Sequence, residues 1–542
     1  MQAIYTQLIE HAQEDGERPA LTEYLGKGRY AVVSRAKLAS LASFFATYWS
    51  RTTANDAVIP IYLERSAVSV AAIIGAIGSQ RAFTCINRKH RAAQVDQILR
   101  QLPGELVLTD QRAADQAITE HLQYPAFASR SWHVVSSTTA PVESLVVLEK
   151  GEIKGAFEDS VLQMSLADPE QPEAALDSRP GCCLFTSGST GASKGVLIGQ
   201  SDLLERAQEE VKWFELTASD SLLGLLPFSF DVGLNQLLSA VLAGAELILL
   251  HSWLPADIRR VCEDRAVTGI SSVPALWRDQ IAADIKLYST NDGAPLRYVT
   301  ISGGDLDPAS LKRLPEIVPG AGIYKTYGQT ETFRSSSLHP EEFSTRPRSV
   351  GRQFGKARFY VIDANGLPCR AGDSGQIVHT GPGTMLGYVD RSKDEEKIRV
   401  NPFHSIVDSA SVAVFTGDYG FVDEEGYLYI TGRKDDMVKV KGNRVYPQEV
   451  VSQLMLVCDI DAAEVIVVQG DMGEPELVAF VQIHPGRDDA PGILRQLRNR
   501  VPSYMVPSKV ITCVELPKLA NGKPDREALK QQARDIMKSV VK

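Results

Sequence analysis

Residues 184–195, LFTSGSTGASKG, decide how this chain folds and what it binds. An apolar run precedes a stretch rich in glycine and hydroxyl side chains, and the stretch ends close to Lys194. Glycine lets the backbone approach an anion closely, hydroxyl and amide groups donate hydrogen bonds to phosphate oxygens, and lysine supplies positive charge. The pattern predicts a phosphate-binding loop after a buried strand, with a solvated Ser/Gly turn as the alternative. No GxxxxGK[ST] run passes through it, so it is not a Walker loop.

Strand-like and helical segments alternate on both sides of this loop. VIPIYL at residues 58–63 and ELVLTD at residues 105–110 are typical of buried strands, and residues 34–51 have helical periodicity. The apolar runs LLGLLPFSF, AELILL, GISSVP and LRYVTISG repeat the alternation further along the chain. The alternation predicts an α/β fold, with a large N-terminal domain of mainly parallel sheets covered by helices.

The pattern changes twice in the last third of the chain. From about residue 352, short strands separated by turns predict a β-rich subdomain. After residue 433 a short α+β pattern follows, and charged, turn-prone residues separate it from the preceding strands. We therefore expect an N-terminal domain over residues 1–433 and a small C-terminal α+β domain over residues 434–542.

Composition excludes several classes of protein. The 542 residues are 44% hydrophobic and 23% charged, which is typical of a globular chain, and the formal net charge of −10 disfavours a nucleic-acid-binding protein. No apolar run reaches the roughly 18–20 residues that cross a bilayer, and the N-terminus lacks the pattern of a signal peptide. The seven scattered cysteines include no CxxC pair and support neither a disulfide framework nor a zinc site. We expect a cytoplasmic protein that binds neither nucleic acid nor membrane.

Four blocks downstream of the loop give it a context. They are TYGQTE at residues 326–331, FTGDYG at 415–420, GRKDDMVKVKGNRVYPQEV at 432–450 and LPKLANGKPDREAL at 516–529. In this order and spacing the five blocks resemble the adenylate-forming superfamily of acyl-CoA synthetases, nonribosomal peptide synthetase adenylation domains and luciferases. The resemblance covers nearly the whole chain. It implies an AMP-forming acid–thiol ligase that uses ATP and Mg²⁺ to make an acyl-adenylate, releases pyrophosphate and passes the acyl group to a thiol.

The resemblance also implies which residues bind the nucleotide. The β- and γ-phosphates would lie against the loop residues Thr186, Ser187, Gly188, Ser189, Thr190, Gly191 and Lys194. Thr330 would contact the α-phosphate, and Glu331 would hold Mg²⁺, which prefers oxygen ligands. Tyr327 would lie beside adenine, Asp418 would accept hydrogen bonds from the ribose hydroxyls, and Arg433 would lie near the ribose and phosphates. Considered alone, Glu331 would suit the first turn of a helix, Tyr327 a half-buried core and Asp418 a turn.

Three residues of the C-terminal segment receive roles in the same way. Lys523 matches the catalytic lysine, which touches both the substrate carboxylate and the α-phosphate. Asp435 matches the hinge about which a mobile C-terminal domain turns between two half-reactions. Gly442 would line the tunnel for a phosphopantetheine thiol in the second conformation.

The block LPFSFDVGLNQL at residues 226–237 corresponds to the family's substrate pocket. Asp231 matches the aspartate that pairs with the substrate ammonium in amino-acid-activating members, although it could instead cap the following helix. By motif offset, the polar pocket wall should also include Asn235, Thr300, Ser302, Thr326, Arg334 and Ser335. Such a lining disfavours a long fatty chain.

Arg334 suggests what kind of acid is bound. Beside Asp231 it could pair with a second carboxylate, whereas the alternative is an arginine that faces the triphosphate or solvent. We therefore expect an amino acid, with an acidic or β-amino acid as the sharper hypothesis. Because the sequence stops soon after the lysine block, we expect a free-standing enzyme of natural-product biosynthesis that acts in trans on an acyl or peptidyl carrier protein. A ligase that uses coenzyme A is the alternative. A luciferase-type monooxygenase fits the polar pocket poorly, and a silent nucleotide-binding protein would not need the retained charged residues.

Overall fold

The computed structural model describes most of the chain. The described residues are 2–90, 92–104, 106–111, 130–135, 144–149, 152–158, 179–187, 193–288, 296–404, 410–433, 438–440, 443–445, 447–457, 460–469, 475–483, 490–498, 501, 503–519 and 524–539.

Two nine-stranded sheets form the larger part of the molecule. The first contains, in spatial order, β17 (Arg352–Gln353), β16 (Ser336–Leu338), β15 (Gly322–Tyr327), β14 (Tyr298–Ile301), β13 (Gly269–Ser272), β11 (Ser221–Gly224), β12 (Glu246–Leu249), β1 (Pro19–Gly26) and β2 (Arg29–Ser34). Its strands from β15 to β1 are parallel. The second contains β20 (Gly387–Tyr388), β10 (Ser193–Gly199), β9 (Pro180–Ser187), β4 (Ala82–Cys85), β3 (Val58–Tyr62), β5 (Leu106–Asp110), β6 (Ser131–Val135), β7 (Ser144–Glu149) and β8 (Glu152–Glu158).

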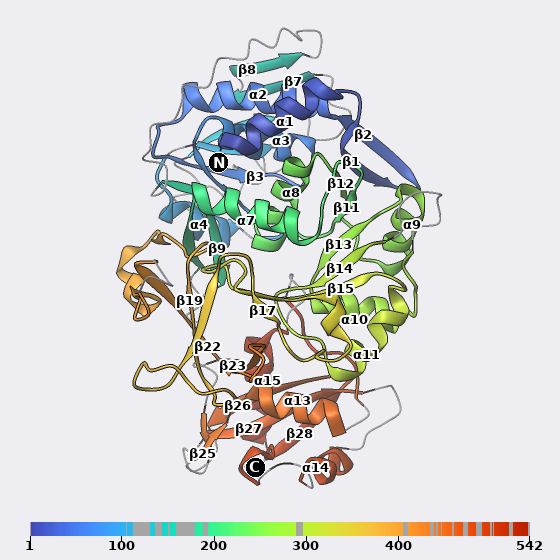
Figure 1. The fold of residues 1–542 in the computed structure, drawn as a ribbon, viewed down its shortest axis with the longest axis vertical. Helices are drawn as coiled ribbons and strands as arrows, with labels where there is room; N and C mark the ends of the chain where they lie inside the picture. The colour runs from blue at the N-terminus through green and yellow to red at the C-terminus, as the bar shows by residue number, and fades with distance from the viewer. Residues whose placement is uncertain are drawn as a thin grey trace.

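Helices lie between and around these sheets (Figure 1). They are α1 (Gln2–Glu14), α2 (Arg35–Thr52), α3 (Ala67–Gly78), α4 (Ala92–Gln101), α7 (Gln200–Trp213), α8 (Asp231–Ala243), α9 (Pro255–Arg265), α10 (Pro274–Ala282), α11 (Pro308–Ile317) and α12 (Pro340–Phe343). Helix α7 contacts β9 and β10 of the second sheet, and its neighbour α8 contacts β11 and β12 of the first. The pair α7–α8 thus joins the two sheets and shares one apolar core with α2 and α3. The expected α/β fold is confirmed.

A smaller antiparallel sheet covers the region after residue 357. It consists of β18 (Arg358–Ile362), β19 (Gly375–Thr380), β21 (Ile398–Val400), β22 (Val412–Val422) and β23 (Leu428–Arg433), with the 3₁₀ helix η3 (Arg391–Glu396) before β21. This sheet corresponds to the β-rich section expected from the sequence.

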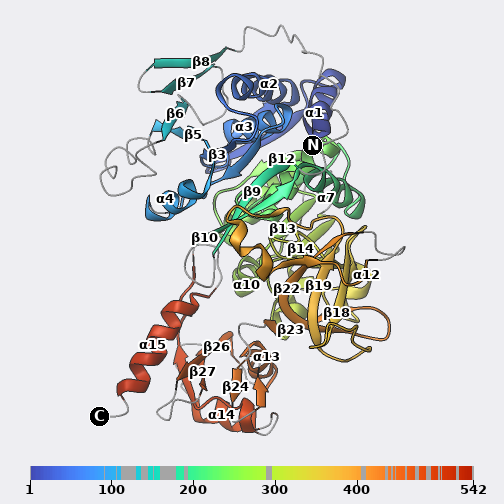
Figure 2. The same ribbon diagram turned by 90° about the vertical axis from the view of Figure 1, so that its left-hand side faces the viewer.

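The elements after residue 433 lie at one end of the molecule in both views (Figure 1, Figure 2). They are β24 (Val438–Val440), β25 (Asn443–Val445), α13 (Pro447–Val457), β26 (Ala462–Gln469), β27 (Pro475–Gln482), α14 (Ala490–Arg498), η5 (Ser503–Met505), β28 (Lys509–Cys513) and α15 (Arg526–Ser539). Strands β24 and β25 pair with each other, and β26, β27 and β28 form a three-stranded sheet. The domain boundary at residues 433 and 434 stays a prediction. No helix in the described ranges has the length and apolar character that crossing a membrane requires.

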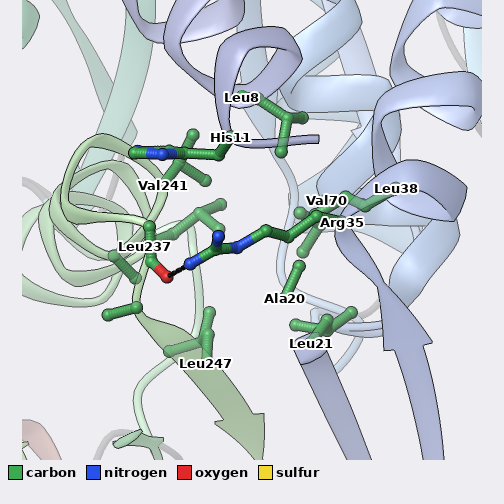
Figure 3. Close-up of a pocket in the computed structure, with 13 residues that line it drawn as sticks. Leu8, His11, Ala20, Leu21, Arg35, Leu38, Val70, Leu237, Val241 and Leu247 are labelled. Carbon is green, nitrogen blue, oxygen red and sulfur yellow. Dashed lines mark hydrogen bonds between the residues drawn. The ribbon is translucent and has the colours of Figure 1, made fainter. Parts of the chain in front are cut away.

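Helix α8 is fixed at its C-terminal end inside a mainly apolar pocket (Figure 3). Arg35 reaches from α2 and donates from Nη2 to the carbonyl oxygen of Gly244 at 2.5 Å. The Nε2 atom of His11 lies 3.2 Å from the carbonyl oxygen of Leu242. Cationic and donor groups at a helix C-terminus satisfy its last carbonyls and complement its dipole. This anchoring explains how α8 holds Asp231, at its opposite end, in a defined position.

Candidate active site

The predicted phosphate loop connects two strands of a hairpin. Thr186 and Ser187 end β9, and Lys194 lies opposite Thr186 on the antiparallel strand β10. The loop residues Gly188, Ser189, Thr190 and Gly191 lie outside the described residues. Phosphate binding by this loop stays a prediction.

Tyr388 connects Lys194 with the TYGQTE block. Its ring lies 5.4 Å from Nζ of Lys194, measured from the ring centroid, and its hydroxyl donates to Oε1 of Glu331 at 2.9 Å. Tyr388 is buried because β20, which carries it, pairs with β10. The predicted triphosphate lysine and the predicted Mg²⁺ carboxylate are therefore neighbours. Tyr388 was not predictable from the sequence, because nothing in a short Gly-Tyr pair indicates that it lies beside Glu331.

Asp418 is the centre of a second cluster. Its Oδ2 accepts hydrogen bonds from the Tyr327 hydroxyl at 2.8 Å and from Nε2 of Gln329 at 2.5 Å, and its Oδ1 lies 3.3 Å from Nε of Arg433. Burial and the neighbouring Asp418 carboxylate raise the pKa of Tyr327 well above its usual value, so its hydroxyl stays a donor. The structure brings together the three residues expected at the nucleoside, and it adds Gln329, which the sequence analysis did not single out.

A tight turn joins the nucleotide residues to the acid-binding side. At Gly328 an added Cβ would lie 1.7 Å from the carbonyl oxygen of Phe333, so only glycine fits there. Phe333 itself has a φ of 54°, which is unusual for a bulky residue. Thr330 and Glu331 lie within this turn, and Arg334 follows it.

A pocket on the other side of this turn contains the predicted substrate residues. Five of the positions expected from the sequence line it: Asp231, Asn235, Ser302, Thr326 and Arg334. Arg206 of α7 and the aromatic ring of Phe354 also line it, and the sequence analysis identified neither.

Two further expected wall residues do not line this pocket. Thr300 is fully buried behind Ser302, to whose hydroxyl it lies at 3.2 Å, while Ser302 is 2.8 Å from the Thr326 hydroxyl. The hydroxyl of Ser335 lies 3.0 Å from Nδ1 of His379. The expectation was wrong for Thr300 because it lies deeper on β14. It was wrong for Ser335 because the preceding turn directs its side chain toward the β-rich sheet.

Asp231 does not cap α8 from the N-cap position. The helix begins at Asp231, its N-cap is Phe230, and no side-chain cap bond is formed there. The Oδ1 atom accepts a hydrogen bond from the backbone amide of Val232 at 2.7 Å. Asp231 is half-buried and lies at the N-terminus of α8.

Arg334 is buried, and its guanidinium has a partner within the protein. Its Nη2 donates to Oε1 of the buried Glu210 at 3.1 Å, and its guanidinium lies between the rings of Phe214 and Phe354 at 5.5 and 4.9 Å from their centroids. Glu210 also accepts hydrogen bonds from Asn235 and, at 3.0 Å, from Ser239. The charge of Arg334 is thus already balanced by Glu210. The simple expectation of a guanidinium held ready for the substrate needs correction.

The three C-terminal predictions fall on parts of the chain that the structure does not describe. Asp435, Gly442 and Lys523 all lie outside the described residues. Within the described ranges, no group of three or more His, Cys, Asp or Glu residues could hold a metal ion. A cation beside Glu331 would therefore need phosphate oxygens and water for most of its coordination, which is the usual environment of Mg²⁺ at a nucleotide.

Known proteins resemble this chain over most of its length. A family model described as "AMP-binding enzyme" matches residues 8–389. Delta-poly-L-ornithine synthetase of Acinetobacter baumannii is 29% identical over 68% of this chain and 27% of that protein. Nonribosomal peptide synthetase 13 of Aspergillus fumigatus is 26% identical over 98% of this chain and 24% of that protein. The chain thus spans well under a third of the length of either relative.

Solved structures share the whole fold. ATP-bound MatB from Rhodopseudomonas palustris has a TM-score of 0.80 and 20% identity, over 99% of both chains. The coenzyme A synthetase MenE from Bacillus subtilis, in complex with ATP and magnesium, has a TM-score of 0.74 and 21% identity, over 97% of this chain and 99% of that one. These likenesses establish the fold, and the family model establishes the family. The chain belongs to the AMP-binding enzyme family.

Proposed function

We propose that this enzyme activates an amino acid as its adenylate and transfers it to the phosphopantetheine thiol of a separate carrier protein. The observation that carries the proposal is the position of Asp231 in a polar pocket with Ser302 and Thr326. The same pocket wall includes Gly328, from which the chain continues directly to Glu331. A carboxylate at this place can pair with a substrate ammonium while the substrate carboxylate lies toward the nucleotide.

In the first half-reaction a substrate carboxylate oxygen attacks the α-phosphorus of ATP. A bond forms between that oxygen and phosphorus, the bond to the bridging oxygen of the β-phosphate breaks, and pyrophosphate leaves. Lys194 would neutralise the departing phosphates, and Thr330 would donate to the α-phosphate. Lys523 would contact both the carboxylate and the α-phosphate, where negative charge increases in the transition state.

Glu331 would hold Mg²⁺ together with the phosphate oxygens. The hydroxyl of Tyr388 occupies one of the two carboxylate oxygens and fixes the orientation of the group. When bound, the ion would neutralise charge on the triphosphate. Asp418 would exchange one of its present donors for the ribose hydroxyls, and Tyr327 would support the adenine side.

In the second half-reaction the acceptor thiol would attack the adenylate carbonyl carbon. A thioester forms, the bond to the phosphate oxygen breaks, AMP leaves, and the thiol proton is released to solvent. We propose that residues 434–542 turn about Asp435 to bring Gly442 to the thiol tunnel. The relative named nonribosomal peptide synthetase 13 supports a carrier-protein acceptor, whereas the coenzyme A synthetase MenE among the fold neighbours keeps coenzyme A as the alternative.

ATP–pyrophosphate exchange with a panel of α-amino, β-amino, dicarboxylic, aryl and fatty acids tests the proposal. We expect exchange only with acids that carry an amine, loss of at least about 100-fold in Asp231→Ala, and near-complete loss in Lys523→Ala. Retention of activity with amine-free acids, unchanged in Asp231→Ala, would refute the role of Asp231. Thioester formation on carrier protein or on coenzyme A, followed by mass spectrometry, then identifies the acceptor.

A further inference from the structure

Arg206 is a buried cation that lines the substrate pocket and has no hydrogen-bond acceptor among the described residues. It lies on α7, its residue is 1% exposed, and it is one of the largest fully buried side chains in the described ranges. None of its three guanidinium nitrogens has a hydrogen-bond partner in the part of the chain that the structure describes. A buried guanidinium keeps its charge, and leaving five donors unsatisfied is costly unless a ligand accepts them.

The carboxylates around Arg206 have other partners. Glu205 pairs with Lys356 at 2.9 Å, and Glu209 pairs with Lys212 at 3.4 Å. Asp202, one turn earlier, accepts a hydrogen bond from the backbone amide of Gly383 at 2.9 Å. These three carboxylates attract Arg206 at longer range, but burial still lowers the pKa of its guanidinium, and the neighbouring Arg334 acts in the same direction.

A second free donor lies on the same wall. Nη1 of Arg334 is buried and has no partner among the described residues, although Nη2 of the same group is held by Glu210. Both guanidinium groups face the ring of Phe354, at 5.6 Å for Arg206 and 4.9 Å for Arg334. Both residues also line the same pocket, so a ligand bound there has both guanidinium groups in its wall.

From these contacts we infer that the acid activated here carries a second carboxylate, which binds Arg206 and the free Nη1 of Arg334. This inference rests on the proposed amino-acid activation and narrows its substrate to an amino acid with an additional acidic group. Planar guanidinium groups match the two oxygens of a carboxylate.

The charged side chains of the pocket match such a substrate. Three charged side chains line the pocket: the cation Arg334, which pairs with Glu210, the cation Arg206 and the anion Asp231. An ammonium at Asp231 together with a carboxylate at Arg206 places an opposite charge beside each. A neutral amino acid would serve Asp231 and leave Arg206 without an acceptor, which is the arrangement that buried sites disfavour most. Arg206 thus replaces Arg334 as the principal carboxylate-binding residue.

Assays of the wild-type enzyme with two series of acids test the roles of Arg206 and Asp231 separately. ATP–pyrophosphate exchange is measured with aspartate, asparagine, succinate and butyrate, and with the longer series glutamate, glutamine, glutarate and valerate. We expect a member with both an amine and a second carboxylate to exceed its amide partner by at least about 100-fold in kcat/KM. If amides or other neutral amino acids exceed the acidic ones, the inference about Arg206 fails and amino-acid activation stands. If succinate or glutarate equals its amine-bearing partner, the role of Asp231 fails and that of Arg206 stands.

Arg206→Met and its matched control Lys212→Met test the residue itself, since both lie on α7 and the side chain of Lys212 is 72% exposed. We expect Arg206→Met to lose about 100-fold in kcat/KM for the acidic amino acid, with KM for ATP unchanged, and to gain relative activity with the amide. Arg206→Met should also raise the midpoint of thermal unfolding of the ligand-free enzyme, because it removes an unpaired buried charge. A lowered midpoint with unchanged acid-over-amide preference would show a purely structural role and overturn the inference. The wild-type panel decides the matter if the variant does not fold.

Discussion

The nucleotide side of the site and the acid-binding pocket differ in how their charges are satisfied. On the nucleotide side, Asp418 already has Tyr327, Gln329 and Arg433 as partners, and Glu331 is held by Tyr388. In the pocket, Arg206 has no partner among the described residues. The first arrangement is organised before ligand binds and suits a ligand that every family member shares. The second is complete only when the particular acid is bound, so the charge of Arg206 determines which acid the pocket selects.

A substitution in the turn that joins the two sides should impair both of them, and we expect it to have the largest effect on activity. In Gly328→Ala the new Cβ would lie 1.7 Å from the carbonyl oxygen of Phe333, and the backbone would have to move. Because Glu331 lies within this turn and Arg334 follows it, both sides should be displaced together. We expect exchange with every acid to fall by more than about 10³-fold, since an ångström of misplacement alone can cost about 10².

Gly304→Ala is the matched control for this change. The nearest atom to its added Cβ is Cγ of Pro274 at 3.4 Å, an ordinary contact, and Gly304 does not line the pocket. Its activity should stay close to that of wild type. If Gly328→Ala lost activity only with the preferred acid while its nucleotide binding was normal, the turn would not be shared by the two sides.

The same comparison explains how much of the site the sequence could predict. The loop flanks Thr186 and Lys194 and the nucleoside residues lie in contiguous motifs, and five of the pocket positions expected from the sequence line one cavity. Contacts between distant segments were not predictable, because they depend on how the chain returns on itself. Glu210 and Arg334, for example, are 124 residues apart and meet only because α7 packs beneath the pocket.

The local sequence pattern also does not predict how deeply a side chain is buried or in which direction it points. Thr300 lies in β14 and Ser302 follows its last residue, and of these two only Ser302 lines the cavity. Ser335 is directed away by a turn in which Phe333 has a positive φ, a conformation that periodicity does not reveal. Arg206 lies on a helix whose amphipathic pattern would be satisfied by a salt bridge within α7. Its burial without a partner among the described residues is a property of the assembled fold.

Removing the charge of Glu210 tests how much its pairing with Arg334 contributes to the stability of the pocket. Glu210→Gln leaves Arg334 as a second uncompensated buried cation and weakens the bonds from Asn235 and Ser239. We expect the free energy of unfolding to fall by about 3 kcal/mol or more, as when one partner of a buried ion pair is removed. Urea unfolding followed by tryptophan fluorescence measures it, and Trp213 at the end of α7 is close enough to report.

Glu205→Gln controls for a charge change on the same helix. Its carboxylate pairs with Lys356, whose side chain is 73% exposed, so the loss should stay below about 1 kcal/mol. Equal effects of the two variants would mean that the buried network around Glu210 contributes no more than a surface pair.

Tyr388→Phe tests the nucleotide side of the site, and we expect it to have the smallest effect of these substitutions. The change removes one hydroxyl that donates to Oε1 of Glu331 and keeps the ring near Lys194. Loss of a group that orients a metal-binding carboxylate typically costs about 10-fold or more, so we expect the Mg²⁺ concentration for half-maximal exchange to rise about 10-fold. The acid-over-amide preference should not change, because that preference depends on Arg206 and Asp231. Tyr288→Phe, at a surface tyrosine bonded to Arg259, should leave both quantities unchanged. A shift in acid preference without any shift in Mg²⁺ dependence would place Tyr388 with the pocket and contradict the division between the two sides.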